Sequence, residues 1–385
     1  MDYLTQLQDQ LDHFKEDTLF RECVCIDSAQ GPIIRMSDGS EKVLLCSNNY
    51  LNLASDQRVC QAARDALEAF GFGAAASRLV SGTMSPHVKL EHEFATFLGK
   101  EAALYFPSGW TANQALLTTL PQKGDLVLID RLDHASIIDA VKTSEADFRT
   151  YRRGHIDKLK RYLEDPAYTN RFIVTESIFS MDGDAANLVE LAALKKQYNA
   201  ILIVDEAHAL GCFGANGAGL CEEAGILRDV DIIVAPLGKA IAATGGIVAG
   251  PRTVIDYLIN KARPFIYTTA PSPVITAAAS KSLEIIQSEP QRRQQLQSNA
   301  EYVRNELLEM GLDIGQSMSQ IIPVILGESE KAVAVSKRLY EAGFFVSAIR
   351  PPTVPPGTAR LRISLQSYHT QQQLNDLCQL LKQIV

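Results

Sequence analysis

The sequence predicts an α/β fold with a large domain, built on a mostly parallel sheet covered by helices, and a smaller C-terminal α+β domain. Six short apolar segments recur along the chain, and each is followed by a turn and a stretch of helical character. They span residues 103–108, 126–130, 172–177, 201–208, 231–236 and 245–250. Strands that are apolar on both faces and that alternate with helices are typical of parallel sheets.

The character of the sequence changes after about residue 273. A long helical pattern leads into the strand-like segments IIPVIL, FFVSAI and ARLRISL, with the proline-rich loop RPPTVPPGTA between the last two and a closing helix after them. A chain of 385 residues is long enough for roughly two or three domains. We therefore expect an N-terminal segment over residues 1–45, a large domain over 46–280 and a small domain over 281–385.

Composition argues against several classes of function. Hydrophobic residues make up 46% of the chain and charged residues 21%, which is typical of a globular protein. The net charge is -8 and no basic run of five or more residues occurs, so we expect no nucleic-acid partner. No run approaches the ~18 apolar residues of a membrane span, and the acidic, amphipathic N-terminus does not resemble a signal peptide. We therefore expect a cytoplasmic protein without a membrane segment.

Cysteine and histidine spacing predicts neither disulfides nor a metal site. The seven cysteines are scattered, and we interpret them as free thiols in a reducing cytoplasm. His87, Glu91 and His92 lie one residue too far apart for the H-x-x-E-H metal pattern and are expected to share one face of a helix. No metal is predicted.

Polar residues gather just after the predicted strands. In an open α/β sheet, ligands bind outside the carboxyl ends of the strands. The residues found there are Ser108, Asp133, His134, Ser180, Asp205, His208 and Lys239. The stretch SGWTANQALL also enters a helix directly after a strand, and the N–H groups at a helix N-terminus make a good phosphate site. GFGAAAS is a poor dinucleotide fingerprint, because no strand precedes it and its last glycine is missing.

Lys239 is the one charged residue of APLGKAIAATGG, where glycine, alanine and threonine surround it. Burial disfavours the charged form of a lysine and lowers its pKa. That effect is useful where the amine must be neutral and nucleophilic, as in a Schiff base. The residues alone leave two interpretations open, an ordinary loop lysine and a Schiff-base lysine.

The combination of motifs resembles the fold-type I pyridoxal-phosphate enzymes and, among them, the α-oxoamine synthases. The matching stretches are CSNNYLNLA, SRLVSGT, DHASIIDA, TESIFSMDGD, VDEAHALGCFG, LGKA, RPFIYTT and AIRPPTVPPGTARLRISL. They follow the order of the family and cover the chain from about residue 20 to its end. The last stretch points to the branch that condenses L-alanine with a pimeloyl thioester in biotin synthesis.

The resemblance implies a pyridoxal 5'-phosphate cofactor and a role for each residue of its pocket. Lys239 would hold the cofactor as a Schiff base and then act as general base on the alanine Cα, and Asp205 would keep the pyridine nitrogen protonated. His134 would stack on the ring and His208 would hydrogen-bond its oxygen. The remaining cofactor contacts would come from Gly109, Trp110 and Ser180 and, across a homodimer with shared active sites, from Thr268 and Thr269.

Two carboxylates of the implied substrates need recognition. The alternation in ARLRISL puts Arg360 and Arg362 on one face of a strand, and an arginine fork binds a carboxylate bidentately. By the resemblance, Arg362 would bind the carboxylate of alanine. The other substrate-binding residues implied are Arg21, Arg350 and Thr353, at the far carboxylate of the pimeloyl chain, and Asn48.

The chain departs from the family pattern at two places. The family has a threonine three residues before the Schiff-base lysine, and this chain has Pro236, which offers neither a hydroxyl nor a backbone N–H. The family's GSGGSR reads GAAASR here, which places Ala74, Ala75 and Ala76 in a loop near the acyl substrate. Both changes bear on cofactor affinity and acyl preference. Two alternatives remain: a sister synthase using glycine or serine with another acyl-CoA, and a relative that binds pyridoxal phosphate without catalysis.

Overall fold

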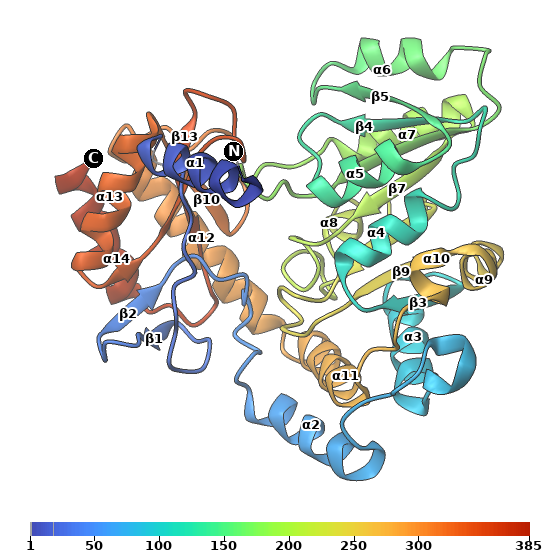
Figure 1. Ribbon diagram of the computed structural model, residues 1–385, viewed down its shortest axis with the longest axis horizontal. Coiled ribbons are helices and arrows are strands. Elements are labelled where there is room, and N and C mark those ends of the chain that lie inside the picture. Colours follow the sequence, from blue (N-terminus) through green and yellow to red (C-terminus); the bar gives the residue numbers. More distant parts are fainter. Residues whose placement is uncertain (1, 18) are drawn as a thin grey trace. The chain divides into compact units, whose positions relative to one another are not determined.

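The computed structural model describes residues 2–17 and 19–385. Contacts divide the chain into two compact units (Figure 1). The larger unit comprises residues 48–180 and 184–295, and the smaller unit comprises residues 1–47, 181–183 and 296–385. Residues 1–47 thus belong to the same unit as the C-terminal residues 296–385. The domain limits expected from the sequence, with boundaries at residues 45 and 280, stay a prediction.

The larger unit contains a seven-stranded sheet of order β3-β9-β8-β7-β6-β4-β5. Its strands are β3 (Ala102–Phe106), β4 (Leu126–Asp130), β5 (Asp147–Tyr151), β6 (Arg171–Glu176), β7 (Ile201–Asp205), β8 (Ile232–Pro236) and β9 (Gly246–Gly250). β5, β4, β6, β7 and β8 pair in parallel, whereas β9 runs antiparallel to both β8 and β3. The predicted mostly parallel sheet is confirmed.

The sequence identified six of these strands and missed β5. The residues of β3, β4 and β9 are buried throughout, so these strands read as continuous apolar segments. β5 lies at the edge of the sheet, and its residues DFRTY alternate between exposed and more buried positions. An edge strand buries fewer side chains and therefore lacks the apolar run by which the others were found.

Helices surround this sheet. They are α2 (Gln57–Phe70), α3 (Ser85–Phe97), α4 (Gly109–Leu117), α5 (Ala135–Thr143), α6 (Ile156–Leu163), α7 (Leu188–Tyr198), α8 (Leu220–Glu223), α9 (Arg252–Lys261), α10 (Arg263–Ile266) and α11 (Pro273–Ser288), with a π-helical turn at Arg78–Gly82. One core cluster joins the apolar faces of α4, α5 and α9 to the sheet, with Phe106, Leu116 and Ile137 fully buried. Both helices that carry predicted site residues at their N-termini, α4 and α5, are therefore anchored by this core.

The smaller unit holds two three-stranded sheets, of order β1-β2-β11 and β10-β13-β12. Their strands are β1 (Ile33–Arg35), β2 (Glu41–Leu44), β10 (Ile321–Gly327), β11 (Phe344–Phe345), β12 (Ser347–Ile349) and β13 (Ala359–Ser364). The unit also contains α1 (Tyr3–Glu16), α13 (Ser329–Glu341) and α14 (Gln371–Ile384), and α12 (Pro290–Glu309) spans the boundary between the units. β13 is fully buried and pairs antiparallel with both neighbours.

Candidate active site

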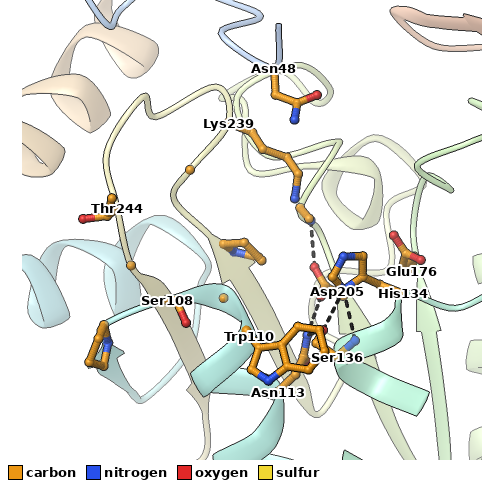
Figure 2. A pocket seen from close by; sticks show the side chains of 16 residues that line it. Asn48, Ser108, Trp110, Asn113, His134, Ser136, Glu176, Asp205, Lys239 and Thr244 are labelled. Carbon is orange, nitrogen blue, oxygen red and sulfur yellow. Dashed lines mark hydrogen bonds between the residues drawn. The ribbon is translucent and has the colours of Figure 1, made fainter. Parts of the chain in front are cut away.

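A cavity of about 330 Å³ lies in the larger unit, beside the carboxyl ends of β6, β7 and β8 and the N-termini of α4 and α5 (Figure 2). It is the location expected for a ligand of an open α/β sheet. Of the residues that the sequence predicted for the site, the structure brings six to its lining: Asn48, Gly109, Trp110, His134, Asp205 and Lys239.

Lys239 lies in a tight turn directly after β8. The turn is held by backbone hydrogen bonds, among them one of 2.8 Å from the amide of Ala242 to the carbonyl of Lys239 and one of 2.9 Å from the amide of Leu237 to the carbonyl of Gly245. Ala242 has φ of 59°, within the left-handed region. Figure 2 shows the Lys239 side chain extending into the cavity toward Asp205.

Asp205 ends β7 and is 4% exposed. Its Oδ1 accepts a hydrogen bond of 2.9 Å from the backbone N–H of Ala207, and its Oδ2 accepts one of 2.9 Å from Nδ2 of Asn113. Asn113 also donates to Oγ of Ser136 at 3.0 Å, and Ser136 lies 2.8 Å from Nδ1 of His134. A chain of polar contacts therefore fixes the carboxylate of Asp205 and the ring of His134 to α4 and α5 (Figure 2).

His134 caps the N-terminus of α5, where its Nδ1 accepts the backbone N–H of Ser136 at 3.2 Å. The side chain is open to the cavity, but the protein atoms around it lower its pKa through desolvation. The negative charge of Asp205 opposes this decrease in pKa, and the positive charge of Lys239 adds to it. The ring of Trp110 meets the imidazole edge to face, with centroids 6.2 Å apart. His134 therefore contributes an imidazole with a lowered pKa to the lining of the cavity.

The N-terminus of α4 also forms part of the cavity wall. Ser108 caps the helix by accepting the N–H of Thr111 at 3.0 Å. The N–H groups of Gly109 and Trp110 belong to the first turn and have no helical carbonyl to bind, so they suit an anion such as a phosphate. A Cβ on Gly109 would lie 2.6 Å from Cβ of Pro236, so the departure from the family at Pro236 is packed directly against this glycine.

Glu176 was not predicted as a site residue, yet it lines the cavity at the end of β6. It is 1% exposed, and its Oε1 has no hydrogen-bond partner among the residues that the structure describes. The pKa of Glu176 is raised to about 8, mainly by burial and then by the charge of Asp205, while the charge of Lys239 opposes the increase. Glu176 can therefore hold a proton at neutral pH, beside the carboxyl group of Asp205.

The structure places four predicted cofactor residues outside the lining of this cavity: His208, Thr268, Thr269 and Ser180. His208 is buried and its Nδ1 lies 2.7 Å from the hydroxyl of Tyr50, which also donates to Oδ1 of Asn48 at 3.0 Å. Thr268 and Thr269 lie in the loop after α10. Thr269 forms a β-bridge with Ser77, so this loop pairs with the segment that follows the three alanines.

Ser180 follows β6 and is also absent from the lining. Asp133, by contrast, has a structural role: it is buried and accepts the backbone N–H groups of Asp130 at 2.8 Å and Glu176 at 3.1 Å. It thereby joins the ends of β4 and β6. Burial, followed by the charges of Glu176 and Asp130, raises the pKa of Asp133 well above its usual value.

Four predicted substrate-binding residues belong to the smaller unit: Arg21, Arg350, Thr353 and Arg362. Arg360 and Arg362 both lie on β13 and are 4% and 7% exposed. Nη1 of Arg360 lies 2.5 Å from Oδ1 of Asp182, within the same unit, whereas Nη1 of Arg362 donates to Oγ of Ser364 at 2.7 Å. Arg360 is therefore engaged in an ion pair that holds residues 181–183 in this unit.

Arg350 lines a hollow of about 880 Å³ within the smaller unit. Apolar side chains form much of its wall, including Phe20, Val24, Leu44 and Phe345. Arg350 is half-buried. Desolvation lowers its pKa, and the nearby charge of Arg21 lowers it further. The two arginines are thus close enough to repel each other, which is an arrangement that an anion would relieve.

Within the described part of the chain, no group of three or more histidine, cysteine or acidic side chains could hold a metal ion. No described helix is both long and apolar enough to cross a bilayer.

Comparisons with known proteins agree with this geometry. The profile of the aminotransferase class I and II family matches residues 40–381. The 8-amino-7-oxononanoate synthase of Alkalilimnicola ehrlichii is 42% identical over 96% of this chain and 95% of its own length. The synthase of the same name from Geobacter sulfurreducens is 43% identical over 95% of this chain and 94% of its own.

Solved structures of related enzymes superpose on this chain over most of its length. The serine palmitoyltransferase of Sphingomonas wittichii superposes with a TM-score of 0.94 at 31% identity, covering 100% of this chain and 98% of that one. The 8-amino-7-oxononanoate synthase of Francisella tularensis gives a TM-score of 0.78 at 32% identity, covering 89% and 97%. A structure of a further serine palmitoyltransferase, with 29% identity and a TM-score of 0.94, contains pyridoxal phosphate.

The residues of the cavity fit that cofactor: a lysine amine, a fixed carboxylate, an aromatic face and two helix N–H groups surround a space beside a glycine that admits no side chain. The chain belongs to the aminotransferase class I and II family and, within it, to the 8-amino-7-oxononanoate synthases, which are acyltransferases dependent on pyridoxal phosphate.

Proposed function

We propose that this chain condenses L-alanine with a pimeloyl thioester and releases carbon dioxide to give 8-amino-7-oxononanoate. The observation that carries the proposal is the single cavity that Lys239, Asp205, His134 and the first turn of α4 line together. The names of the relatives with 42% and 43% identity support the choice of product.

Each residue of the cavity has a proposed task. Pyridoxal phosphate, when bound, supplies an electron sink for a carbanion formed at the amino-acid Cα. Lys239 would hold the cofactor covalently, and its free amine would take the proton from Cα. Asp205 keeps a proton on the pyridine nitrogen, and its two hydrogen bonds from Ala207 and Asn113 hold it in position. Gly109 and Trp110 bind the phosphate through their N–H groups.

The two substrate carboxylates are proposed to bind arginines of the smaller unit. Arg362 binds the carboxylate of L-alanine. Arg350, with Arg21 nearby, binds the far carboxylate of the pimeloyl chain. The apolar side chains that line this hollow together with Arg350 support this assignment, because a methylene chain that ends in a carboxylate suits apolar side chains near a cation. Thr353 lies in the turn after Arg350, and its amide donates a hydrogen bond of 3.1 Å to the carbonyl of Arg350.

The remaining assignments concern assembly and location. We propose a homodimer in which Thr268 and Thr269 reach the cofactor phosphate of the partner subunit. His208 and Ser180 complete the cofactor pocket of the subunit to which they belong. The absence of both threonines from the lining of the Lys239 cavity supports this arrangement. We also propose a cytoplasmic location, which the seven free cysteines support.

The experiment is a product assay with purified protein loaded with pyridoxal phosphate. Pimeloyl thioester is supplied with L-alanine, glycine or L-serine in separate reactions, and product mass and released carbon dioxide are measured. We expect 8-amino-7-oxononanoate from L-alanine alone. Turnover of L-serine instead would favour the activity named for the serine palmitoyltransferases of high structural similarity. Binding of the cofactor with no turnover of any amino acid would indicate a non-catalytic relative.

A further inference from the structure

The turn that carries Lys239 is closed on itself by backbone hydrogen bonds. The amide of Leu237 donates to the carbonyl of Gly245 at 2.9 Å, and the amide of Ala243 donates to the carbonyl of Leu237 at 3.0 Å. Together with the bond of 2.8 Å from Ala242 to Lys239, these contacts join the start of the turn to its end. A displacement of Gly245 would therefore be passed to Leu237 and Lys239.

The end of this turn is held from outside by Tyr105, on β3. The Tyr105 hydroxyl donates a hydrogen bond of 2.9 Å to the carbonyl of Thr244. The next residue, Gly245, has φ of 123°, and a Cβ at this position would overlap the Tyr105 ring. Because glycine has no side chain, the ring lies directly against the backbone of the turn, where its hydroxyl reaches the Thr244 carbonyl.

Tyr105 is itself fixed in place and keeps the proton that it donates. Its side chain is fully buried, and its backbone N–H donates to Oε1 of Glu91 at 3.0 Å. Glu91 in turn forms an ion pair with Arg78, through two contacts of 2.8 and 3.0 Å. Burial raises the pKa of Tyr105 to about 12, so its hydroxyl stays protonated at neutral pH. The donor to Thr244 is therefore held by the fold and does not depend on pH near neutrality.

The first turn of α4 has a support of its own. A Cβ on Gly246 would lie 2.7 Å from Cα of Gly109, so the backbone after the turn packs directly on the start of the helix. Gly246 belongs to β9 and is held there by pairing with β3 and β8. The proposed phosphate site at Gly109 therefore has little need of the Tyr105 hydroxyl. Thr244, which the hydroxyl holds, lies instead on the same loop as Lys239 (Figure 2).

We propose that Tyr105 is a positioning residue that holds the amine of Lys239 in reach of the cofactor aldehyde. The inference rests on the proposed role of Lys239, and it adds a residue that does not line the cavity. The Lys239 nitrogen attacks the aldehyde carbon, and one water leaves as the carbon–nitrogen double bond forms. Without the hydroxyl, the Thr244 carbonyl loses its donor and the turn moves more freely, so the amine is less often placed for this attack.

The test compares Tyr105→Phe with Tyr151→Phe, because each removes one hydroxyl from a buried tyrosine. Tyr151 is 4% exposed and lies on β5, at the opposite edge of the sheet from β3. The rate of covalent attachment of pyridoxal phosphate to the apoprotein is measured by borohydride trapping, with the labelled lysine identified by mass spectrometry. Binding of pyridoxine 5'-phosphate, which has no aldehyde, is measured by calorimetry. Hydrogen exchange of residues 237–245 is measured on the same apoproteins.

We expect Tyr105→Phe to lower the rate constant for attachment at Lys239 roughly three- to ten-fold, the factor that one neutral hydrogen bond supplies. Hydrogen exchange of residues 237–245 should become faster, because the turn opens more readily. The Kd for pyridoxine 5'-phosphate should change little, since the phosphate site keeps its own support. Tyr151→Phe should match the wild type in all three measurements.

A wild-type attachment rate in Tyr105→Phe, or unchanged exchange of residues 237–245, would overturn the proposal. An equal loss in Tyr151→Phe, or a parallel loss of pyridoxine 5'-phosphate binding, would overturn it as well, because either result indicates general damage to the large unit. Attachment of the cofactor to another lysine in the wild type is a separate outcome. It would refute the role of Lys239 in the proposed function, and this proposal would fail with it.

Discussion

Nδ2 of Asn113 donates a hydrogen bond of 2.9 Å to Oδ2 of Asp205, and the same NH₂ group donates to Oγ of Ser136 at 3.0 Å. The two acceptors come from β7 and α5, so one amide on α4 fixes the positions of two walls of the cavity. Asn113 is 2% exposed and therefore has no water to replace either partner. The orientation of the carboxylate that faces the cofactor depends on this amide.

The first prediction follows from this contact. Asn113→Ala removes a hydrogen bond to a charged group, which costs about 1.5–3 kcal/mol, so Kd for pyridoxal phosphate should rise roughly ten- to a hundred-fold. Cofactor affinity is measured by absorbance titration of the apoprotein, with no assay of activity. Asn299→Ala is the control, because Asn299 is equally buried and bonds two backbone carbonyls in the smaller unit. Equal affinities in Asn113→Ala and the wild type would show that Asp205 does not need this amide.

The second prediction concerns the buried Glu176. Its pKa of about 8 in the folded protein lies above its value of 4.5 in the unfolded chain. Between these values the folded state holds a proton that the unfolded chain releases, so the contribution of Glu176 to stability is greatest below about pH 4.5 and decreases as the pH rises toward 8. The slope is about 1.4 kcal/mol per pH unit. Glu176→Gln cannot ionise and should remove this part of the dependence.

The measurement for Glu176 is denaturant unfolding of the apoprotein at several pH values between 5 and 8. The difference in unfolding free energy between Glu176→Gln and the wild type should grow with pH across this range. Glu164→Gln serves as the control, since Glu164 is exposed on the surface. Parallel curves for Glu176→Gln and the wild type would contradict a proton held on this carboxyl.

The fold was predictable where a buried element produces a continuous apolar run in the sequence. The site was predictable only in part. Strands buried on both faces, such as β4, appear as apolar runs, whereas the edge strand β5 does not. Asp205 and Lys239 could be found because each follows such a strand. Asn113 could not, because its partner lies 92 residues further along the chain, and nothing in SGWTANQALL distinguishes it from an ordinary helical asparagine. Glu176 was missed for a similar reason: its raised pKa arises from neighbours that only the folded chain supplies.

The third prediction concerns the alanines that replace family glycines. Ala75 has φ of 55°, in the left-handed region, where a residue with a Cβ costs about 1–2 kcal/mol. Ala75→Gly relieves this cost but makes the unfolded chain more flexible, at about 0.5–1 kcal/mol. We expect a net gain in unfolding free energy of about 0.5–1 kcal/mol. Ala74→Gly, at a neighbouring position without a positive φ, should instead lose stability. Thermal unfolding of both variants decides it, and a loss in both would mean that the loop is not strained at Ala75.

The fourth prediction tests whether active sites are shared between subunits. One variant carries Lys239→Ala, and a second carries Thr268→Ala and Thr269→Ala; each alone should be nearly inactive. If the threonines serve the partner's cofactor, a mixed dimer contains one site with an intact lysine and intact threonines. Activity should therefore return when the two variants are unfolded together and refolded. No recovery, in a mixture that sedimentation shows to contain dimers, would mean that the threonines act in their own subunit.

The last prediction concerns the far carboxylate of the acyl chain. Arg350 lies half-buried beside an apolar hollow and feels the charge of Arg21. If it binds the distal carboxylate, Arg350→Ala loses a charge-assisted hydrogen bond. That loss costs about 1.5–3 kcal/mol, or roughly ten- to a hundred-fold in kcat/KM for the pimeloyl thioester. A thioester of similar length that ends in a methyl group makes no such bond, so its kcat/KM should change little.

The wild type should prefer the carboxylate-ended chain by a similar factor, and Arg350→Ala should remove most of that preference. Arg362→Ala separates the two carboxylates, because it should weaken L-alanine binding whichever acyl donor follows. Arg338→Ala is a suitable control, since Arg338 is exposed on α13 of the same unit. Measuring kcat/KM for both thioesters on all four proteins completes the comparison. Equal losses of kcat/KM for the two thioesters in Arg350→Ala would mean that Arg350 has a structural role. The apolar hollow would then bind some other ligand.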